Sequence, residues 1–350
     1  MKINLLFTAA ILLLATSLDA TVWRVNNRPG TDADYTNLQN AINGASSGDV
    51  IYIEGSPNTY GSVSMNKSLT IIGAGYWLDE NDPTQVYKES SKVSYFYIQN
   101  GSQGSVIMGL DFYMSAPGGT VPIQIWTNNI TIRRNHIVCA CTGTAVAAGV
   151  RLYANVTGVV IEQNWIHTTA ASAGNAYGVY IEDNATNCNI ENNFIQVASG
   201  NHAVYQETED ETTSLIIANN VMWGDLTTYH SSHYNNILLE GTYTAGTGDA
   251  TSNNLCNGTQ YPNINSNQQN IDMSTVFVDY TLLIDNGYIL KAGSPAIAAG
   301  IGGVDCGAFG TNDPYVLSGI PPIPSITGFE MMQSIGTSTL PVTIEAQSNN

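Results

Sequence analysis

Four asparagines recur along this chain at nearly constant spacing. Asn135, Asn164, Asn193 and Asn220 are 29, 29 and 27 residues apart, and each lies between two short apolar runs. A period of this length is typical of a solenoid, in which each coil buries its apolar face only by stacking on its neighbours. We expect asparagine at this corner because it tolerates left-handed dihedral angles, and because stacked asparagine side chains can hydrogen-bond from coil to coil.

The segments before the regular repeat follow the same plan with longer spacings. Gly73 and Gly109 are assigned to the corner position that asparagine takes later in the chain. Residues 34–44 predict a short helix that ends at Gly44, with apolar residues on one face. Such a helix would cover the open first coil of a solenoid, whose strand edges and core side chains are otherwise exposed.

The two ends of the chain differ in composition from its centre. Residues 1–20 predict a secretory signal peptide, with Lys2 before a short apolar run that is too short to span a bilayer. Residues 21–313 are expected to form one solenoid domain, which closes with a strand pair at 288–290 and 308–309. Residues 314–350 contain several prolines and predict a linker or extended strap that ends in a strand near 340–344.

The charge balance limits the kinds of partner. The chain has 10 lysines and arginines against 28 aspartates and glutamates. Nucleic acid is therefore excluded as a partner, because phosphate binding needs a basic surface. With only 11% charged residues, the polar surface suits an exported protein that faces neutral ligands or cations, although acidity can also serve solvation alone. Among five cysteines, Cys188 falls in a strand column of apolar residues, which predicts a buried structural role.

Four segments resemble a known family. Residues 49–54 and 68–75 resemble the opening coils of right-handed parallel β-helix proteins of the pectate-lyase-like superfamily, and residues 290–300 and 305–310 resemble the closing coil of exported bacterial members. The resemblance covers roughly residues 22–315. It implies an all-β fold, a single right-handed parallel β-helix with a short N-terminal capping helix. It implies no single activity, since the superfamily contains lyases, hydrolases, epimerases and adhesins.

The catalytic motifs of this superfamily transfer poorly to the chain. Pectate lyases often carry a Trp-Ile-Asp-His segment, whereas the nearest string here is Trp165-Ile166-His167, which lacks the aspartate. The Asn-Thr-Asp, Asp-Asp and Gly-His-Gly segments of polygalacturonases are not found in order. The resemblance therefore leaves open whether the chain is an enzyme, and if so whether it is a polysaccharide lyase or a glycoside hydrolase.

The strand before each asparagine-marked strand can be aligned from coil to coil, as residues 123–126, 150–153, 179–182 and 204–207. Side chains alternate faces along a strand, so two outward columns result when the first and third residue of each segment point inward. One column contains Gln124, Arg151, Tyr180 and Tyr205, and the other contains Trp126, Tyr153, Glu182 and Glu207. Because adjacent coils are ~4.8 Å apart, these side chains would share one exposed face.

This face is the candidate site. Aromatic rings stack on sugar rings because they offer a large, rigid apolar area, and two carboxylates one coil apart approach the ~5–5.5 Å separation of retaining glycosidases. Glu182 and Glu207 are candidate acid and base, and Arg151 is the candidate lyase base that the resemblance implies. We assign ligand binding to Gln124, Trp126, Tyr153, Tyr180, Asp183 and Tyr205. Ordinary solvated columns remain the alternative, since outward aromatic residues also fill a pleated surface well.

A run of acidic residues suggests a cation site. Residues 207–211 contain four acids, and with Glu182 and Asp183 they could supply oxygen ligands for Ca²⁺, with Glu209 and Asp210 as the candidate metal ligands. The run lacks the order of an EF-hand loop, and acidic runs are often only solvated. No cofactor is required. The pair of His230 and His233 has no third ligand at zinc-like spacing.

The sequence therefore predicts a secreted or cell-surface protein, monomeric and without a transmembrane segment. We expect it to bind, and in one version to process, an extracellular polysaccharide or cell-surface glycan on the exposed sheet face. The competing hypothesis is a non-enzymatic surface or adhesive protein, whose long stacked sheets serve stability and display.

Overall fold

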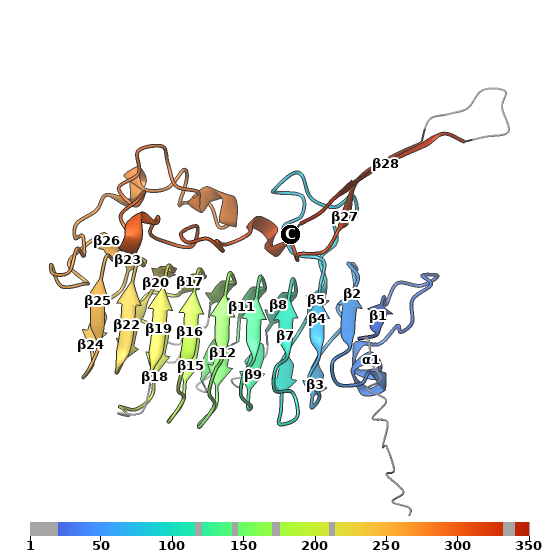
Figure 1. Cartoon of the computed structure of the whole chain (residues 1–350), viewed down its shortest axis with the longest axis horizontal. Helices are drawn as coiled ribbons and strands as arrows, with labels where there is room; N and C mark the ends of the chain where they lie inside the picture. Colours follow the sequence, from blue (N-terminus) through green and yellow to red (C-terminus); the bar gives the residue numbers. More distant parts are fainter. Residues whose placement is uncertain are drawn as a thin grey trace, which may run out of the picture.

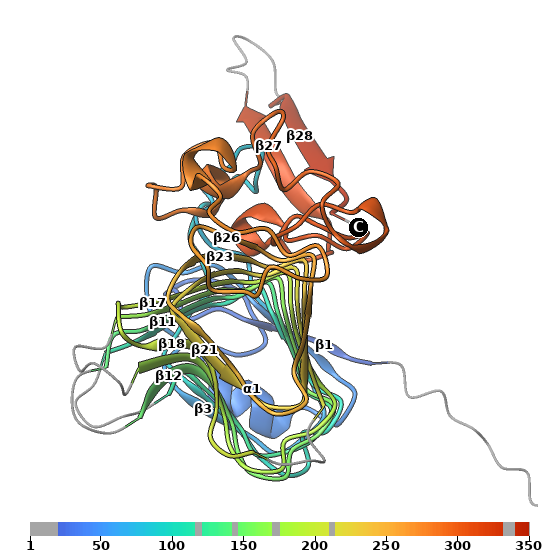
Figure 2. The same cartoon turned by 90° about the vertical axis from the view of Figure 1, so that its left-hand side faces the viewer.

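The computed structural model describes residues 20–115, 121–141, 146–169, 176–209, 214–331 and 340–349. In this part of the chain, three parallel sheets, here named A, B and C, contain all strands but two. Each regular coil passes through sheet A, then sheet C, then sheet B, and lies directly on the preceding coil (Figure 1). Seen along the axis, the sheets enclose one interior (Figure 2). The fold is a right-handed parallel β-helix, as predicted.

The strands are short, because each sheet turns into the next after a few residues. Sheet A contains β1 (Val22–Val25), β2 (Val50–Ile53), β4 (Thr70–Ile72), β7 (Val106–Met108), β10 (Thr131–Arg133), β13 (Val160–Glu162), β16 (Cys188–Glu191), β19 (Leu215–Ala218), β22 (Ser231–Tyr234) and β25 (Ala250–Ser252). Sheet B contains β3 (Val63–Met65), β6 (Phe96–Ile98), β9 (Ile123–Ile125), β12 (Ala147–Leu152), β15 (Ala176–Ile181), β18 (His202–Gln206), β21 (Asp225–Thr228) and β24 (Tyr243–Ala245). Sheet C contains β5 (Lys92–Val93), β8 (Asp111–Met114), β11 (His136–Cys139), β14 (Trp165–Thr168), β17 (Phe194–Val197), β20 (Val221–Trp223), β23 (Ile237–Glu240) and β26 (Leu255–Cys256).

Residues 29 apart are paired neighbours in the regular coils. Val150 pairs with Val179 and Leu152 with Ile181, and these four side chains are fully buried in the interior. The predicted helix is α1 (Leu38–Gly44), which the side chain of Asn37 caps by accepting from the amide of Asn40. Its buried apolar face joins the same core at the N-terminal end of the coil stack.

The repeated asparagines form a continuous hydrogen-bonded column inside one corner. The Oδ1 atom of Asn164 accepts from both the backbone N (2.9 Å) and the Nδ2 atom (3.0 Å) of Asn135. The same pair of bonds joins each next step, and the column continues past the four predicted members through Asn236, Asn254 and Asn267. The last three were missed because the coils shorten there and the spacing is no longer constant.

The left-handed residue of this corner is not the column asparagine but the residue before it. Arg134, Gln163 and Asn192 have φ of 54°, 56° and 55°. Gly109 aligns with Arg134, since Leu110 is the residue whose amide donates to Asn135 Oδ1; Gly73 lies in the same row. The predicted assignment of the two glycines to the asparagine position is therefore wrong by one residue. The preceding residue makes the turn, and this directs the asparagine side chain inward.

Residues 257–270 still close the last coil, with Tyr261 in the main core and Gln268 bridged in parallel to Leu255. Residues 271–324 lie over the outer face of sheet C instead (Figure 1). They contain the short 3₁₀ turns η1 (Met273–Thr275), η2 (Asp285–Tyr288), η3 (Ile301–Gly303) and η4 (Leu317–Gly319). The strand pair expected at 288–290 and 308–309 is absent from this described segment. Sheet C presents an outward apolar column that needs cover, and the apolar residues of this segment supply it. The column runs through Trp165, Phe194, Val221, Ile237 and Leu255.

A buried carboxylate fastens this cover to the loop after β4. Asp285 accepts from Ser318 N (2.7 Å), Asn81 Nδ2 (2.8 Å) and Tyr315 Oη (3.1 Å). The side-chain hydroxyl groups of Tyr315 and Tyr76 also hydrogen-bond to each other. Burial raises the pKa of Asp285, although these donors favour its charged form. The stacked strands end at β26, so the cover is structurally distinct from the coils; the domain boundary at residue 313 remains a prediction.

The tail ends in an antiparallel pair, β27 (Ser325–Met331) and β28 (Val342–Gln347), which extends away from the coils (Figure 1). The strand predicted near 340–344 is therefore present, but it begins two residues later and ends three residues later than predicted. Most of the predicted signal peptide, residues 1–19, lies outside the described residues. No helix in the described ranges is long and apolar enough to cross a membrane.

The asparagine column predicts a large stability effect at its centre. Asn164→Ala would leave the amide of Asn135 and the carbonyls of Ile132 and Glu162 without side-chain partners. We expect a loss of about 2–4 kcal/mol in unfolding free energy, because these groups are buried. Urea denaturation followed by circular dichroism measures it. Asn189→Ala, on the half-buried outer side of sheet A, is the control; equal losses in both variants would contradict a special role for the column.

A second buried polar group lies in the last coils. His233 is 1% exposed, its Nε2 lies 2.9 Å from Thr228 Oγ1, and Thr228 in turn donates to Asp249 (2.9 Å). The Nδ1 atom is buried without a partner. Burial lowers the pKa of His233 to about 4, against the opposing charge of Asp249.

Acid is therefore expected to destabilise these coils through His233. Its folded pKa lies below the unfolded value of about 6.5, so its stabilising contribution is complete above pH 6.5 and is lost as the pH falls towards 4. The expected loss of unfolding free energy is roughly 3 kcal/mol, because one pKa unit corresponds to about 1.4 kcal/mol. Urea denaturation between pH 4 and 7 should show this loss in the native chain and a smaller one in His233→Gln; parallel pH profiles would refute it.

Candidate functional site

The outer face of sheet B carries the first predicted column in the predicted register. Gln124 pairs with Arg151, Arg151 with Tyr180, and Tyr180 with Tyr205. The strands that hold them, β9, β12, β15 and β18, are neighbours, and their inward residues are fully buried. One further aromatic residue, Tyr97, extends the column by one coil, since it pairs with Gln124. The alternating segment of residues 96–98 is the signal that could have found it.

The second column begins with two stacked rings. The ring centroids of Trp126 and Tyr153 are 3.4 Å apart with an interplanar angle of 19°, and Tyr97 meets Trp126 edge-on at 5.7 Å. Trp126 is 41% exposed. The hydroxyl of Tyr153 donates to Gln124 Oε1 (3.1 Å), which fixes the ring plane. These residues form a rigid aromatic surface that keeps part of its area open to solvent.

Beside these rings, Arg151 of the first column and Glu182 of the second column form an ion pair. Arg151 Nε donates to Glu182 Oε1 at 2.7 Å, and the side chains are 23% and 15% exposed. The guanidinium carbon also lies 4.5 Å from the ring centroid of Tyr153 and 5.2 Å from that of Tyr180. Tyr153 and Glu182 are therefore close neighbours on one face, as the 29-residue spacing predicts. Arg151 is held by a carboxylate and two rings.

Tyr180 differs from its predicted surroundings. It points outward, but it is only 5% exposed, because it lies between Tyr177 (4.8 Å between ring centroids) and Tyr205 (5.7 Å). Burial together with a hydrogen bond to Glu207 raises the pKa of Tyr180. Tyr180 therefore supports Arg151 and Glu207 and offers little area to a ligand. Tyr177 was missed because it lies two residues before the aligned segment.

The two candidate catalytic carboxylates occupy adjacent coils. The amide of Glu182 donates to Leu152 O and that of Glu207 to Ile181 O, so the two residues follow paired strands. Glu182 forms an ion pair with Arg151, whereas Glu207 is exposed. The surroundings of the two carboxylates thus differ in exposure and in hydrogen-bonding partners. Their catalytic roles remain predictions.

The calcium hypothesis stays a prediction. Asp210 lies outside the described residues. Asp183 and Glu209 are exposed, and the Oδ1 atom of Asp183 accepts from Thr208. The described residues contain no group of three or more histidine, cysteine, aspartate or glutamate side chains placed to hold a metal ion. The carboxylate oxygens are chemically suited to Ca²⁺, so Glu209 and Asp210 remain proposed ligands only.

Two other sequence candidates lie away from this face. Trp165-Ile166-His167 belongs to β14 in sheet C, and Trp165 is buried beneath the C-terminal cover with Tyr288. Arg133, a further arginine of the regular coils, lies on sheet A, where it pairs with Glu162 (3.5 Å) and with Asp313. Neither segment can contribute to a site on sheet B, because the sheets face different directions.

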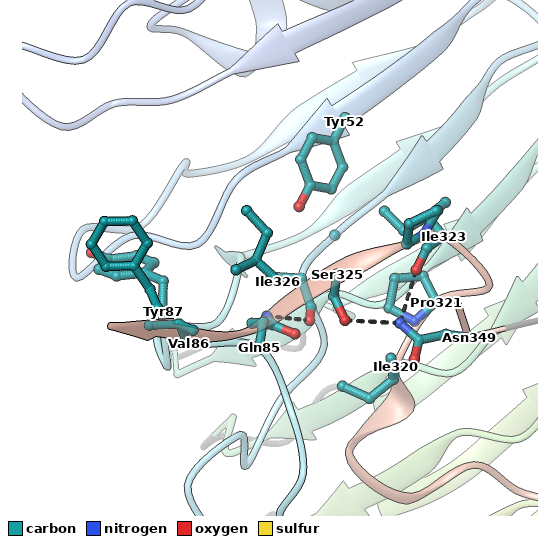
Figure 3. Close-up of a pocket in the computed structure, with 14 residues that line it drawn as sticks. Tyr52, Gln85, Val86, Tyr87, Ile320, Pro321, Ile323, Ser325, Ile326 and Asn349 are labelled. Atoms are coloured by element: carbon teal, nitrogen blue, oxygen red, sulfur yellow. Dashed lines mark hydrogen bonds between the residues drawn. The ribbon is translucent and has the colours of Figure 1, made fainter. Parts of the chain in front are cut away.

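The tail and the coils form a cleft of about 440 Å³ (Figure 3). Tyr52 of sheet A and the loop residues Val86 and Tyr87 face Ile326 and Phe329 of β27. The amide of Val86 donates to Ile326 O (2.8 Å). No charged residue lines this cleft, so it offers no acid–base pair, and we place the candidate chemistry on sheet B.

No protein-family model and no curated protein matches this chain. Among solved structures, the pectate lyase Pel9A is 16% identical, with 84% of this chain and 98% of that chain covered and a TM-score of 0.38. A polygalacturonate lyase fused with a self-assembling amphipathic peptide is 12% identical, with 79% and 83% covered and a TM-score of 0.34. A DFA-IIIase mutant from Arthrobacter chlorophenolicus A6 is 13% identical, with 67% and 84% covered and a TM-score of 0.31.

At these identities the comparisons concern the fold alone. The stronger statement comes from the chain itself, in which the strands of successive coils pair in parallel within three sheets. On that ground the chain is a right-handed parallel β-helix protein.

Proposed function

We propose that this protein is exported and binds an extracellular polysaccharide along the outer face of sheet B. The observation that carries the proposal is the stacked pair of Trp126 and Tyr153, beside the ion pair of Arg151 and Glu182. An aromatic surface of this kind suits a sugar ring, because it is flat, apolar and already ordered before binding. The neighbouring charged groups suit sugar hydroxyls as hydrogen-bonding partners.

The charges of the face favour an uncharged glycan. Arg151 is the one cation among the candidate residues, and Glu182 already neutralises it. Asp183, Glu207 and Glu209 add exposed negative charge. A uronate polymer would meet like charges here, and like charges in proximity disfavour binding. A neutral polysaccharide avoids this repulsion, and the hydroxyl groups of its sugars can donate to the carboxylates.

If the bound glycan is also cleaved, hydrolysis fits these residues better than β-elimination. A lyase base must accept a proton, whereas the guanidinium of Arg151 is charged, paired and stacked between two rings. Glu182 and Glu207 lie on adjacent coils in different surroundings. In this version of the proposal they act as acid and base on a glycosidic bond.

Loss of the stacked ring should weaken glycan binding. Tyr153→Ala removes the ring that contacts Trp126 and Arg151, and we expect an affinity loss of about tenfold for the best neutral ligand. A glycan array identifies that ligand, and isothermal titration calorimetry measures its affinity. Tyr234→Ala, a half-buried tyrosine on the outer side of sheet A, is the matched control. Unchanged affinity in Tyr153→Ala would place the ligand elsewhere.

Any catalytic activity should depend on the two carboxylates. Reducing-end and ultraviolet assays of the same glycans, with and without Ca²⁺, separate hydrolysis from elimination. We expect Glu182→Gln and Glu207→Gln each to lower a hydrolytic kcat by about 100-fold or more. An unsaturated product would contradict the hydrolytic version, and Ca²⁺-dependent binding of polygalacturonate would contradict the preference for neutral glycans. Binding to no glycan at all would support the non-enzymatic surface protein.

A further inference from the structure

A second pocket lies on the outer face of sheet C, near the N-terminal end of the stack. Its volume is about 570 Å³, within the range of small-molecule sites. It is lined by Pro57, Thr59, Lys92, Val93, Ser94, Asp111, Tyr113 and His136. None of these residues belongs to the proposed polysaccharide face on sheet B, so the pocket, here called the sheet-C pocket, is a separate feature.

The polar centre of the sheet-C pocket is a histidine oriented by a carboxylate. His136 Nδ1 lies 2.9 Å from Asp111 Oδ1, and the two residues are paired neighbours on β11 and β8. Nδ1 is engaged by Asp111, which leaves Nε2 as the ring nitrogen that can hydrogen-bond a ligand. Nε2 has no hydrogen-bond partner among the described residues and is not one of the buried atoms without one. It is therefore open to a ligand.

Neighbouring side chains hold both His136 and Asp111 in place. The ring of His136 lies against Trp77, with 4.6 Å between the ring centroids, and against Tyr76 at 5.4 Å. The second oxygen of Asp111 accepts from Ser90 Oγ (2.8 Å). Burial acts to raise the pKa of Asp111, but the hydrogen bonds from His136 and Ser90 and the charge of His136 lower it overall. The Nε2 atom of His136 is thus positioned before any ligand arrives.

The charges around the sheet-C pocket compensate one another. Lys92 Nζ lies 3.0 Å from Glu89 Oε2, and Asp111 is engaged by His136. A charged ligand would have to compete with these pairs, whereas an uncharged one would not. One wall presents Tyr113, which is 60% exposed. An exposed tyrosine ring offers the flat apolar area on which a sugar ring stacks.

We propose that the sheet-C pocket binds an uncharged, hydroxyl-rich ring of the size of one sugar. A hydroxyl of the ligand hydrogen-bonds to His136 Nε2, and the face of the ring stacks on Tyr113. The inference is independent of polysaccharide binding on sheet B, because the two surfaces share no residue and lie on different sheets.

Nuclear magnetic resonance of the full chain tests this proposal. The protein is labelled with ¹³C at histidine Cε1, and the His136 signal is assigned by its absence in His136→Gln. Glucose, galactose and xylose are titrated into the Trp126→Ala/Tyr153→Ala variant. Because this variant lacks the aromatic pair on sheet B, sugar binding on that face does not contribute to the result. We expect at least one of these sugars to shift the His136 signal saturably, at concentrations at which galacturonate does not.

The wall residue provides the second measurement. Tyr113→Ala should lower the affinity for the sugar by about fivefold, the effect of losing one stacked ring. Tyr113→Phe should retain the affinity, because the ring remains. Tyr113 is exposed, so neither variant should alter the circular dichroism spectrum. No shift with any of the three sugars would overturn the proposal, as would full affinity in Tyr113→Ala. Equal or tighter binding of galacturonate would overturn the assignment to an uncharged ligand.

Discussion

Hydrogen bonding between successive coils is the constraint on which the rest of this structure depends. A coil of three short strands cannot satisfy its own backbone groups, and each sheet does so by pairing in parallel with the coil above and below. At the corner between sheets A and C the backbone turns, and the buried asparagine column supplies the bonds that strands cannot. This column fixes the register, and the register decides which side chains become neighbours on the outside.

The three outer faces then take different roles. Sheet C presents an apolar column, and residues 271–324 cover it with a second core, which is anchored through the buried carboxylate of Asp285. Sheet B presents rings and charges instead, and among its side chains Trp126 keeps a substantial exposed area. A face that carries polar and aromatic groups can remain open to solvent at little cost. This contrast is the reason for placing polysaccharide binding on sheet B, whereas the separate sheet-C pocket lies near the N-terminal end of sheet C.

On sheet B the outward side chains hold one another in place through direct contacts. Tyr153 contacts Trp126, Gln124 and Arg151, while Arg151 is bonded to Glu182. A ligand would meet a surface that is already ordered, which lowers the entropic cost of binding. The same contacts hold the guanidinium of Arg151 in an ion pair with Glu182, and this favours the proposed hydrolysis over β-elimination.

The sequence by itself determined the repeat and the pairing of residues 29 apart, because strand alternation and a constant coil length are local properties. For the same reason it determined the inward and outward positions within residues 123–126, 150–153, 179–182 and 204–207. It did not determine the shorter coils that carry Asn236 and Asn254, the cover over sheet C, or the burial of Tyr180. Those depend on contacts between segments far apart in the chain, such as Tyr76 with Tyr315. No local pattern encodes such contacts, because they exist only once the coils are stacked and their outer faces compete for cover.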